Sequence, residues 1–195
     1  FLLFSYVVNQ QMLSIDEETQ KLATQWHPSL YLINHINESV SNYRIAEYEH
    51  ATSNNELQVM GAENLIKRYG SLTLNLFDEY AKYIKSDGET ALYQNILASY
   101  QSYRRFSEEI LDLSRNNDKK SSLSLLSNSR LSYEVLISSI DRLRVFNQTG
   151  SSHVNEMASS VFHKAQSIVI AVSGLITIMA LGFMVFSEQH IAYAL

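Results

Sequence analysis

Apolar side chains recur every three or four residues over most of this chain. That period is typical of one face of an α-helix and differs from the alternation of a half-buried strand. Four such series follow one another and begin at Leu22, Leu57, Leu92 and Leu126. The helices that this pattern predicts span residues 9–52, 54–85, 89–115 and 120–166.

Polar segments separate the four series. The breaks are "ATSNNE" at 51–56, "KSDGET" at 85–90 and "SRNNDKKSS" at 114–122. They carry the Asn, Ser, Asp and Gly that cap helices and form turns. Pro28 lies inside the first predicted helix, so we expect a kink or a break near residue 27.

Two apolar runs flank the amphipathic region. The stretch from Ile168 to Phe186 contains no charged residue, and its polar side chains are those of Ser173 and Thr177. About 20 apolar residues of helix cross a bilayer core, so this run predicts a transmembrane helix over 167–187, followed by the start of a cytoplasmic region over 188–195.

The other run, "FLLFSYVV" at residues 1–8, is shorter. We interpret it as the C-terminal part of a first transmembrane helix. The alternative is a signal peptide, which would show a basic segment and a small-residue cleavage site, and neither is present.

Short connections make neighbouring helices antiparallel. The predicted fold is therefore all-α: an antiparallel up-down four-helix bundle flanked by transmembrane helices, with residues 9–166 as one domain. An even number of helices returns the chain to the membrane that it left.

Composition agrees with this architecture and limits the function. One Pro and six Gly favour a few long helices, and the absence of Cys excludes disulfides and thiolate metal sites. The net charge of -5 is unlike that of a nucleic-acid-binding protein, so we expect no nucleic-acid partner.

Three stretches resemble a known family. They are "NHINESVSNYRIAEYEHA", "ALYQNILASYQSYRRFSEEILDLSR" and "SLLSNSRLSYEVLISSIDRLRVFNQ", and the second carries Tyr100 and Tyr103 in an aromatic-x-x-Tyr pattern. The chain is similar to the four-helix-bundle ligand-binding region of bacterial methyl-accepting chemotaxis receptors. The resemblance covers nearly the whole chain as a pattern of dispersed positions.

This resemblance implies a homodimeric chemoreceptor in the bacterial inner membrane, whose bundle senses a small solute in the periplasm. A small helix displacement would then pass through the second span to a cytoplasmic signalling domain. The segment "SEQHIAYAL" lacks the basic residue and the Pro that usually follow the span in this family. The sensor input of a histidine kinase or of a cyclic-dinucleotide enzyme therefore stays open as an alternative.

A carboxylate-bearing solute favours Arg, whose planar fork binds it through two hydrogen bonds, with Tyr hydroxyls nearby. The candidate ligand-binding residues lie on or beside the predicted helix seams: Arg44, Tyr100, Tyr103, Arg104 and Arg144. The competing interpretation is that such basic side chains cover apolar surface and extend into solvent.

Catalytic and metal-binding patterns are weak. No two of the six His have the i, i+4 spacing of a zinc site, and His35 and His50 are expected on polar faces. The chain has no Gly-rich phosphate loop and no nucleophile elbow. We expect no enzyme activity, no metal and no cofactor. A protein-docking bundle without a small ligand is the alternative to a solute sensor.

Overall fold

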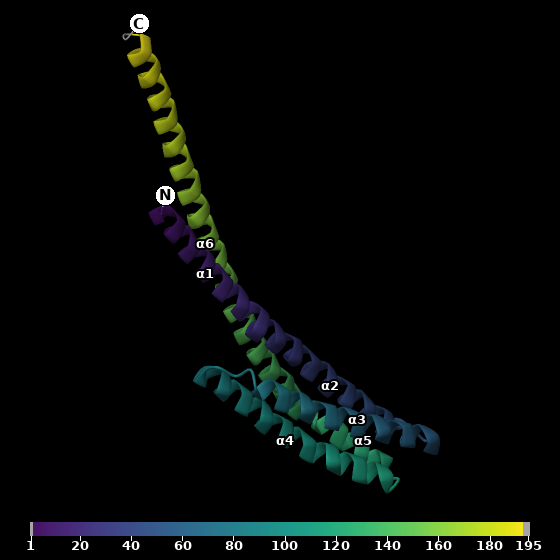
Figure 1. The fold of residues 1–195 in the computed structure, drawn as a ribbon. Coiled ribbons are helices and arrows are strands. Elements are labelled where there is room, and N and C mark those ends of the chain that lie inside the picture. The colour runs from purple at the N-terminus through teal and green to yellow at the C-terminus, as the bar shows by residue number, and fades with distance from the viewer. Residues whose placement is uncertain (1, 193–195) are drawn as a thin grey trace. The chain divides into compact units, whose positions relative to one another are not determined.

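The computed structural model describes residues 2–192, with side chains for residue 6 and for residues 8–187. Every element of this described part is a helix (Figure 1). A short π-helical segment, Leu22–Trp26, lies between the first two α-helices. The α-helices are α1 (Leu2–Lys21), α2 (His27–Thr52), α3 (Glu56–Ala81), α4 (Asp87–Arg115), α5 (Lys119–Asn128) and α6 (Arg130–Ala192).

The chain forms two compact units. One consists of residues 24–151, and the other joins residues 1–23 with residues 152–195. Most side chains of residues 1–8, and all those of 188–195, fall outside the described part. The predicted first span, the cytoplasmic start and the limits of the 9–166 domain therefore stay predictions.

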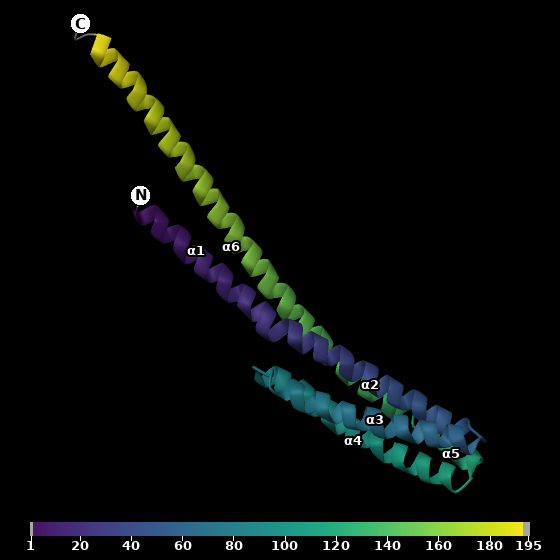
Figure 2. The ribbon, with the colours of Figure 1, turned by 45° about the vertical axis from the view of Figure 1, so that its right-hand side comes forward.

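The unit of residues 24–151 is a four-helix bundle, which confirms the predicted fold class. Helices α2, α3 and α4 each supply one member, and α5 together with the first part of α6 supplies the fourth. Both views of the ribbon show α3 and α4 running side by side (Figures 1 and 2).

The polar breaks supply the caps that begin three of these helices. The side chain of Asn55 accepts a hydrogen bond from the Leu57 amide at 2.9 Å at the start of α3. Ser86 caps α4 and Asp118 caps α5 in the same manner. Each cap satisfies an amide that the helix itself leaves without a partner.

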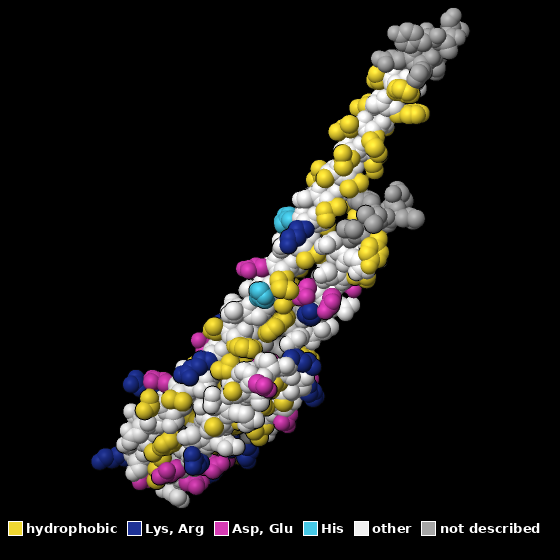
Figure 3. Space-filling model, turned by 90° about the vertical axis from the view of Figure 1, so that its left-hand side faces the viewer, with side chains coloured by type: hydrophobic (Ala, Val, Ile, Leu, Met, Phe, Trp, Pro, Cys, Tyr) yellow, Lys and Arg dark blue, Asp and Glu magenta, His cyan; other side chains and the backbone are white. Residues whose placement is uncertain are grey.

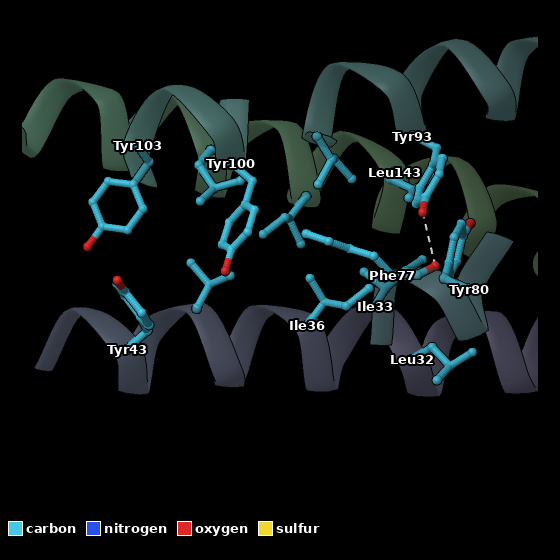
Figure 4. Close-up of a cluster of buried hydrophobic side chains, with 14 of the residues drawn as sticks. Leu32, Ile33, Ile36, Tyr43, Phe77, Tyr80, Tyr93, Tyr100, Tyr103 and Leu143 are labelled. Carbon is cyan, nitrogen blue, oxygen red and sulfur yellow. Dashed lines mark hydrogen bonds between the residues drawn. The ribbon is translucent and has the colours of Figure 1, made fainter. Parts of the chain in front are cut away.

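The bundle core contains several aromatic side chains. Tyr43, Phe77, Tyr80 and Tyr103 are among its largest fully buried members. In Figure 4 they extend inward from α2, α3 and α4. Most of the buried hydroxyls are hydrogen-bonded; that of Tyr93, for example, donates to the Phe77 carbonyl oxygen at 3.0 Å. Hydroxyl partners offset the cost of placing Tyr in a core.

The start of the second apolar series does not belong to the core. Leu57 and Met60 are 76% and 57% exposed. The first α3 residues buried in the core are Ala62 and Ile66, which lie on a different face of the helix. The helical spacing of apolar residues is therefore confirmed for α3, but the face that it predicts to be buried is wrong for the first turn of this helix.

The irregularity predicted near residue 27 is present. The π-helical segment Leu22–Trp26 ends at α2, and Pro28 lies in the first turn of that helix. Proline and π-helical turns are both common causes of bends in helices. A Cβ at Gly150 of α6 would lie 2.2 Å from the Trp26 ring, so only glycine leaves room for the indole there.

The fourth bundle helix differs from the sequence prediction. The pattern predicts one helix over 120–166, whereas the structure ends α5 at Asn128 and begins α6 at Arg130. The Ser129 hydroxyl donates to the Leu126 carbonyl oxygen at 2.9 Å, as does a guanidinium N–H of Arg44 at 2.7 Å. These bonds satisfy a carbonyl that the break would otherwise leave without a partner.

The C-terminal apolar run lies within α6. Among the described residues, one helical stretch, Lys119–Ser187, is long and apolar enough to cross a membrane, and its most apolar window is not buried. In the upper part of the view in Figure 3, the described side chains are mostly hydrophobic or uncharged.

Candidate functional site

Arg44 projects from α2 into the bundle and is only 6% exposed. It donates to Ser129 Oγ at 2.8 Å, to the Leu126 carbonyl oxygen at 2.7 Å and to Glu47 Oε2 at 3.3 Å. The guanidinium also lies against the rings of Tyr48, Tyr103 and Tyr133. The structure thus uses this predicted ligand donor to fasten the α5–α6 break to α2.

Glu47 is the partner of Arg44 and is fully buried. It accepts a hydrogen bond from the hydroxyl of Tyr103, another predicted ligand residue, while its Oε1 has no hydrogen-bond partner. Burial raises the pKa of Glu47, although Ser107, Tyr103 and Arg44 act in the opposite direction. Burial also raises the pKa of Tyr103, and the nearby carboxylate adds to this.

Arg104 differs from Arg44 in its surroundings. This α4 side chain is about one-third exposed, and its one ion pair, with Glu108, is long at 3.6 Å. Its guanidinium lies 5.2 Å from the centre of the Tyr43 ring. A Cβ at Gly70 would lie 2.9 Å from Arg104 Nη1, so the missing side chain makes room for the cation beside α3. A guanidinium carries five N–H donors, so Arg104 can bind a further acceptor besides Glu108.

Tyr100 lies one helical turn before Arg104. Its hydroxyl is buried without a hydrogen bond of normal geometry, although Arg104 and Thr73 lie near enough to oppose the rise in pKa that burial causes. In Figure 4 the Tyr100 ring points from α4 toward α2. A buried hydroxyl that lacks a partner is uncommon in folded proteins.

Two hollows meet at Arg104 on the surface between α3 and α4. Their volumes are about 630 and 540 Å³, and both are lined by Leu74, Arg104 and Glu108. We call them together the Arg104 groove. The residues that line only the first are Ala98, Tyr100, Gln101 and Arg105. The residues that line only the second are Tyr43, Ile66, Lys67, Gly70, Ser71, Leu111, Asp112 and Arg115.

Arg144 is not part of this arrangement. It lies on an exposed face of α6, pairs with Asp141 on the same helix, and lines neither hollow. Of the five predicted residues, the structure therefore brings Tyr100 and Arg104 to one groove, buries Arg44 and Tyr103 together, and places Arg144 elsewhere.

Sequence reasoning missed two buried polar residues, Glu47 and His50. Both are fully buried, and the expectation that His50 lies on a polar face is wrong. They form a Glu-x-x-His tetrapeptide, and this spacing on one helix was the signal that could have identified them. Their side chains have different partners, and no three metal-binding side chains gather among the described residues.

Comparison with known proteins adds a family to this geometry. Residues 4–162 match the model of a four-helix-bundle sensory module for signal transduction. A relative in Bacillus subtilis (strain 168), "Putative sensory transducer protein YvaQ", is 23% identical over 175 residues. The match covers 88% of this chain and 31% of that relative, so the chain spans about a third of the relative's length.

Proposed function

Because the chain belongs to the family of four-helix-bundle sensory modules for signal transduction, we propose that it is the solute-sensing region of a transmembrane chemoreceptor. The role of a sensor in signal transduction is that of the family. The ligand, the cellular location and the mechanism of transmission are our proposals. The ligand is a small organic anion, and the protein carrying this bundle acts by signalling rather than by catalysis.

The observation that carries the ligand proposal is the state of Arg104. A half-buried guanidinium with a single long ion pair leaves N–H groups for a carboxylate, which it can bind through two parallel hydrogen bonds. The Tyr100 hydroxyl, which is buried near Arg104 and Thr73 without a hydrogen bond of normal geometry, can add a third bond after a small rotation. Leu74 and Ala98 offer apolar surface to the body of the same ligand.

In our proposal Arg44 and Tyr103 do not contact the ligand; they belong to a chain of contacts that begins at Arg104. Arg104 lies over the Tyr43 ring, and the Tyr43 hydroxyl is bonded to Ser107, one turn of α4 beyond Tyr103. Tyr103 in turn is bonded to Glu47, the partner of Arg44. A ligand that draws Arg104 away from Tyr43 would disturb contacts that lead to the α5–α6 break.

Transmission follows from the length of α6. This single helix extends from Arg130 at the break to Ala192 and contains the apolar run. A ligand that binds one packing of the bundle better than another shifts the equilibrium between them, and α6 would carry the difference across the bilayer. We place the bundle in the periplasm and the apolar run in the inner membrane.

We further propose that the sensor is a homodimer. Tyr31, Ile45 and Tyr48 are exposed on α2. Their spacings of 14 and 3 residues match the a and d positions of a coiled-coil seam. Ile45→Glu should convert the dimer to a monomer in sedimentation experiments. Leu57→Glu, a change at an exposed apolar residue on α3, should leave the dimer intact.

Thermal unfolding of the whole chain in detergent micelles tests the ligand proposal. A panel of organic acids, amino acids and inorganic anions is added at a large excess. A ligand at a hundred times its dissociation constant stabilises the folded form by about 2.7 kcal/mol, which raises the melting temperature of a chain of this size by about 5–10 °C. We expect this rise for one class of acid.

The control is matched to Arg104. Arg130 also forms an i, i+4 pair with a glutamate at 3.6 Å, but lies exposed at the start of α6. Arg104→Gln should abolish the rise in melting temperature, whereas Arg130→Gln should preserve it. A well-folded chain that no solute stabilises would instead favour the docking bundle, whose ligand is another protein. The bundle can be fused to the signalling domain of a chemoreceptor, of a histidine kinase or of a cyclic-dinucleotide enzyme. The fusion whose output responds to the solute distinguishes these alternatives.

A further inference from the structure

His50 occupies a buried junction of four helices and does not itself line the Arg104 groove, although Arg115, which faces this junction, does. It is the last basic residue of α2 and is fully buried. Its Nδ1 lies 2.9 Å from Ser114 Oγ of α4, and its Nε2 lies 3.3 Å from Glu63 Oε1 of α3. Lys119, the first residue of α5, donates to Ser114 Oγ at 3.0 Å and to the His50 carbonyl oxygen at 3.1 Å.

Ser114 can satisfy either protonation state of this ring. When His50 is neutral, the Ser114 hydroxyl can donate to Nδ1 while Nε2–H donates to Glu63. When His50 is charged, Nδ1–H donates to Ser114 Oγ, and the hydroxyl turns to the His50 carbonyl oxygen at 3.0 Å. Both acceptors are already within hydrogen-bond distance, so the ring gains a proton without losing a partner.

We propose that His50, Ser114 and Glu63 form a proton-binding site that makes the bundle a sensor of acidification, in addition to a sensor of solutes. The ligand is a proton at His50. The response is a loosening of α5, because the charged ring and the Lys119 ammonium then share the same Ser114 oxygen. Like charges this close repel each other strongly in a buried setting.

Charged groups reach this junction from each of the three helices that surround His50. Glu63 of α3 favours the protonated ring, whereas Lys119 of α5 and Arg115 of α4 oppose it. Arg115 is itself held by Glu63 at 2.7 Å and by Asp112 at 3.2 Å. Burial, followed by these two cations, lowers the pKa of His50 from its ordinary value. Lys119 is the cation that lies at the start of α5.

The first measurement is the exchange of the imidazole C2 hydrogen, followed by mass spectrometry from about pH 5 to about pH 8 on the whole chain in micelles. The midpoint of the His50 titration should lie below the ordinary imidazole value of 6.5. Lys119→Met should raise the His50 midpoint by about half a pH unit or more. Lys120→Met, a change at the exposed neighbour, should leave it in place.

The second measurement is amide hydrogen exchange across α5 at about pH 5 and about pH 8, corrected for the intrinsic rate. Exchange in α5 should increase at least threefold at the lower pH in the wild type and in His35→Gln, and should not change in His50→Gln. An acid response that persists in His50→Gln would overturn the proposal. A His50 titration midpoint that Lys119→Met does not move would also overturn it. This second test does not use His50→Gln, so it stays available if that variant fails to fold.

Discussion

The Arg44–Glu47 pair is the most constrained feature at the scale of single residues. Both side chains are buried, and the other bonds of Arg44 go to Ser129 and to the Leu126 carbonyl oxygen. Removing one member of a buried pair leaves the other charge without compensation, which usually costs more than the pair itself contributes. We therefore expect substitution of Arg44 to reduce the stability of the bundle, a role that unfolding measurements separate from the ligand binding proposed for Arg104.

Arg44→Met should lower the free energy of unfolding by about 3–5 kcal/mol, because Glu47 loses its cation and the helix break loses two bonds. Urea unfolding followed by circular dichroism measures this loss. The double variant Arg44→Met/Glu47→Gln should recover at least about 1 kcal/mol of it, since the neutral amide needs no cation. Additive losses in the double variant would contradict a coupled pair.

His50 gives a prediction of pH dependence. Its pKa is lowered in the folded chain from an ordinary value of 6.5, so the unfolded chain takes up the proton first as the pH falls. The free energy of unfolding should therefore decrease as the pH drops below about 6.5. The pKa of Glu63 is also lowered, which adds a further loss below about pH 4.5.

Comparison of the wild type with His50→Gln isolates the first effect. The difference in unfolding free energy between about pH 7.5 and about pH 5 should be larger in the wild type, because other groups contribute equally to both proteins. Equal pH dependence in the two proteins would mean that the pKa of His50 is the same in the folded and unfolded chain, which would contradict the lowering expected from its burial.

At the scale of residues, the sequence identified Arg104 and Tyr100 because they lie beside an apolar seam, and the structure places them at one groove. It did not separate them from Arg44, because a seam position does not tell whether a cation finds an internal acceptor. The acceptor here is a main-chain carbonyl, that of Leu126, at a break that hydrophobic periodicity does not reveal.

At the scale of helices, spacing was sufficient to recognise the four members of the bundle. The turn at "KSDGET" begins α4 because Ser86 caps it, and Glu89 accepts hydrogen bonds from the Lys85 amide and the Tyr80 hydroxyl. The division at Ser129 could not be predicted, because it depends on Arg44, a residue 85 positions away in sequence.

The contact between Trp26 and Gly150 gives a prediction at this scale. Gly150→Ala would put a methyl group 2.2 Å from the indole ring, so the ring must move. Trp26 is the only tryptophan, and its emission should shift to longer wavelength as the indole becomes exposed. The variant should also lose stability by about 1–3 kcal/mol, as overpacked sites do.

Gly61→Ala is the matched control within α3. A Cβ there meets nothing within 4 Å, so the substitution should leave the emission unchanged and stabilise the helix by about 0.5–1 kcal/mol. A red shift in both variants, or in neither, would contradict the close approach of Trp26 to Gly150.

At the scale of the whole molecule, the apolar run in α6 decides whether the protein is a membrane sensor. Ile176→Arg places a charge near the middle of this run, which costs about 2.5–3.5 kcal/mol for insertion into a bilayer. The variant should therefore be recovered less from the membrane fraction than the wild type. Leu57→Arg, a change at an exposed residue of the bundle, should be recovered as the wild type is.

The architecture of the bundle followed from periodicity and breaks, since these are local properties of the chain. Its ligand did not, because binding depends on which donors remain free after the core has formed. Arg104 is such a donor, held beside Gly70 and over Tyr43, with a long ion pair of 3.6 Å to Glu108. That state comes from three helices together and is visible only in the folded molecule.

Calorimetric titration of the whole chain in lipid nanodiscs with the acid that stabilises it most is the most direct test of solute sensing at Arg104. We predict binding to the wild type and to Arg130→Gln with equal affinity. Arg104→Gln should weaken it at least about tenfold, because charge-assisted hydrogen bonds to the carboxylate are lost. Unchanged binding by folded Arg104→Gln, or no binding by the folded wild type across the panel, would contradict the proposal.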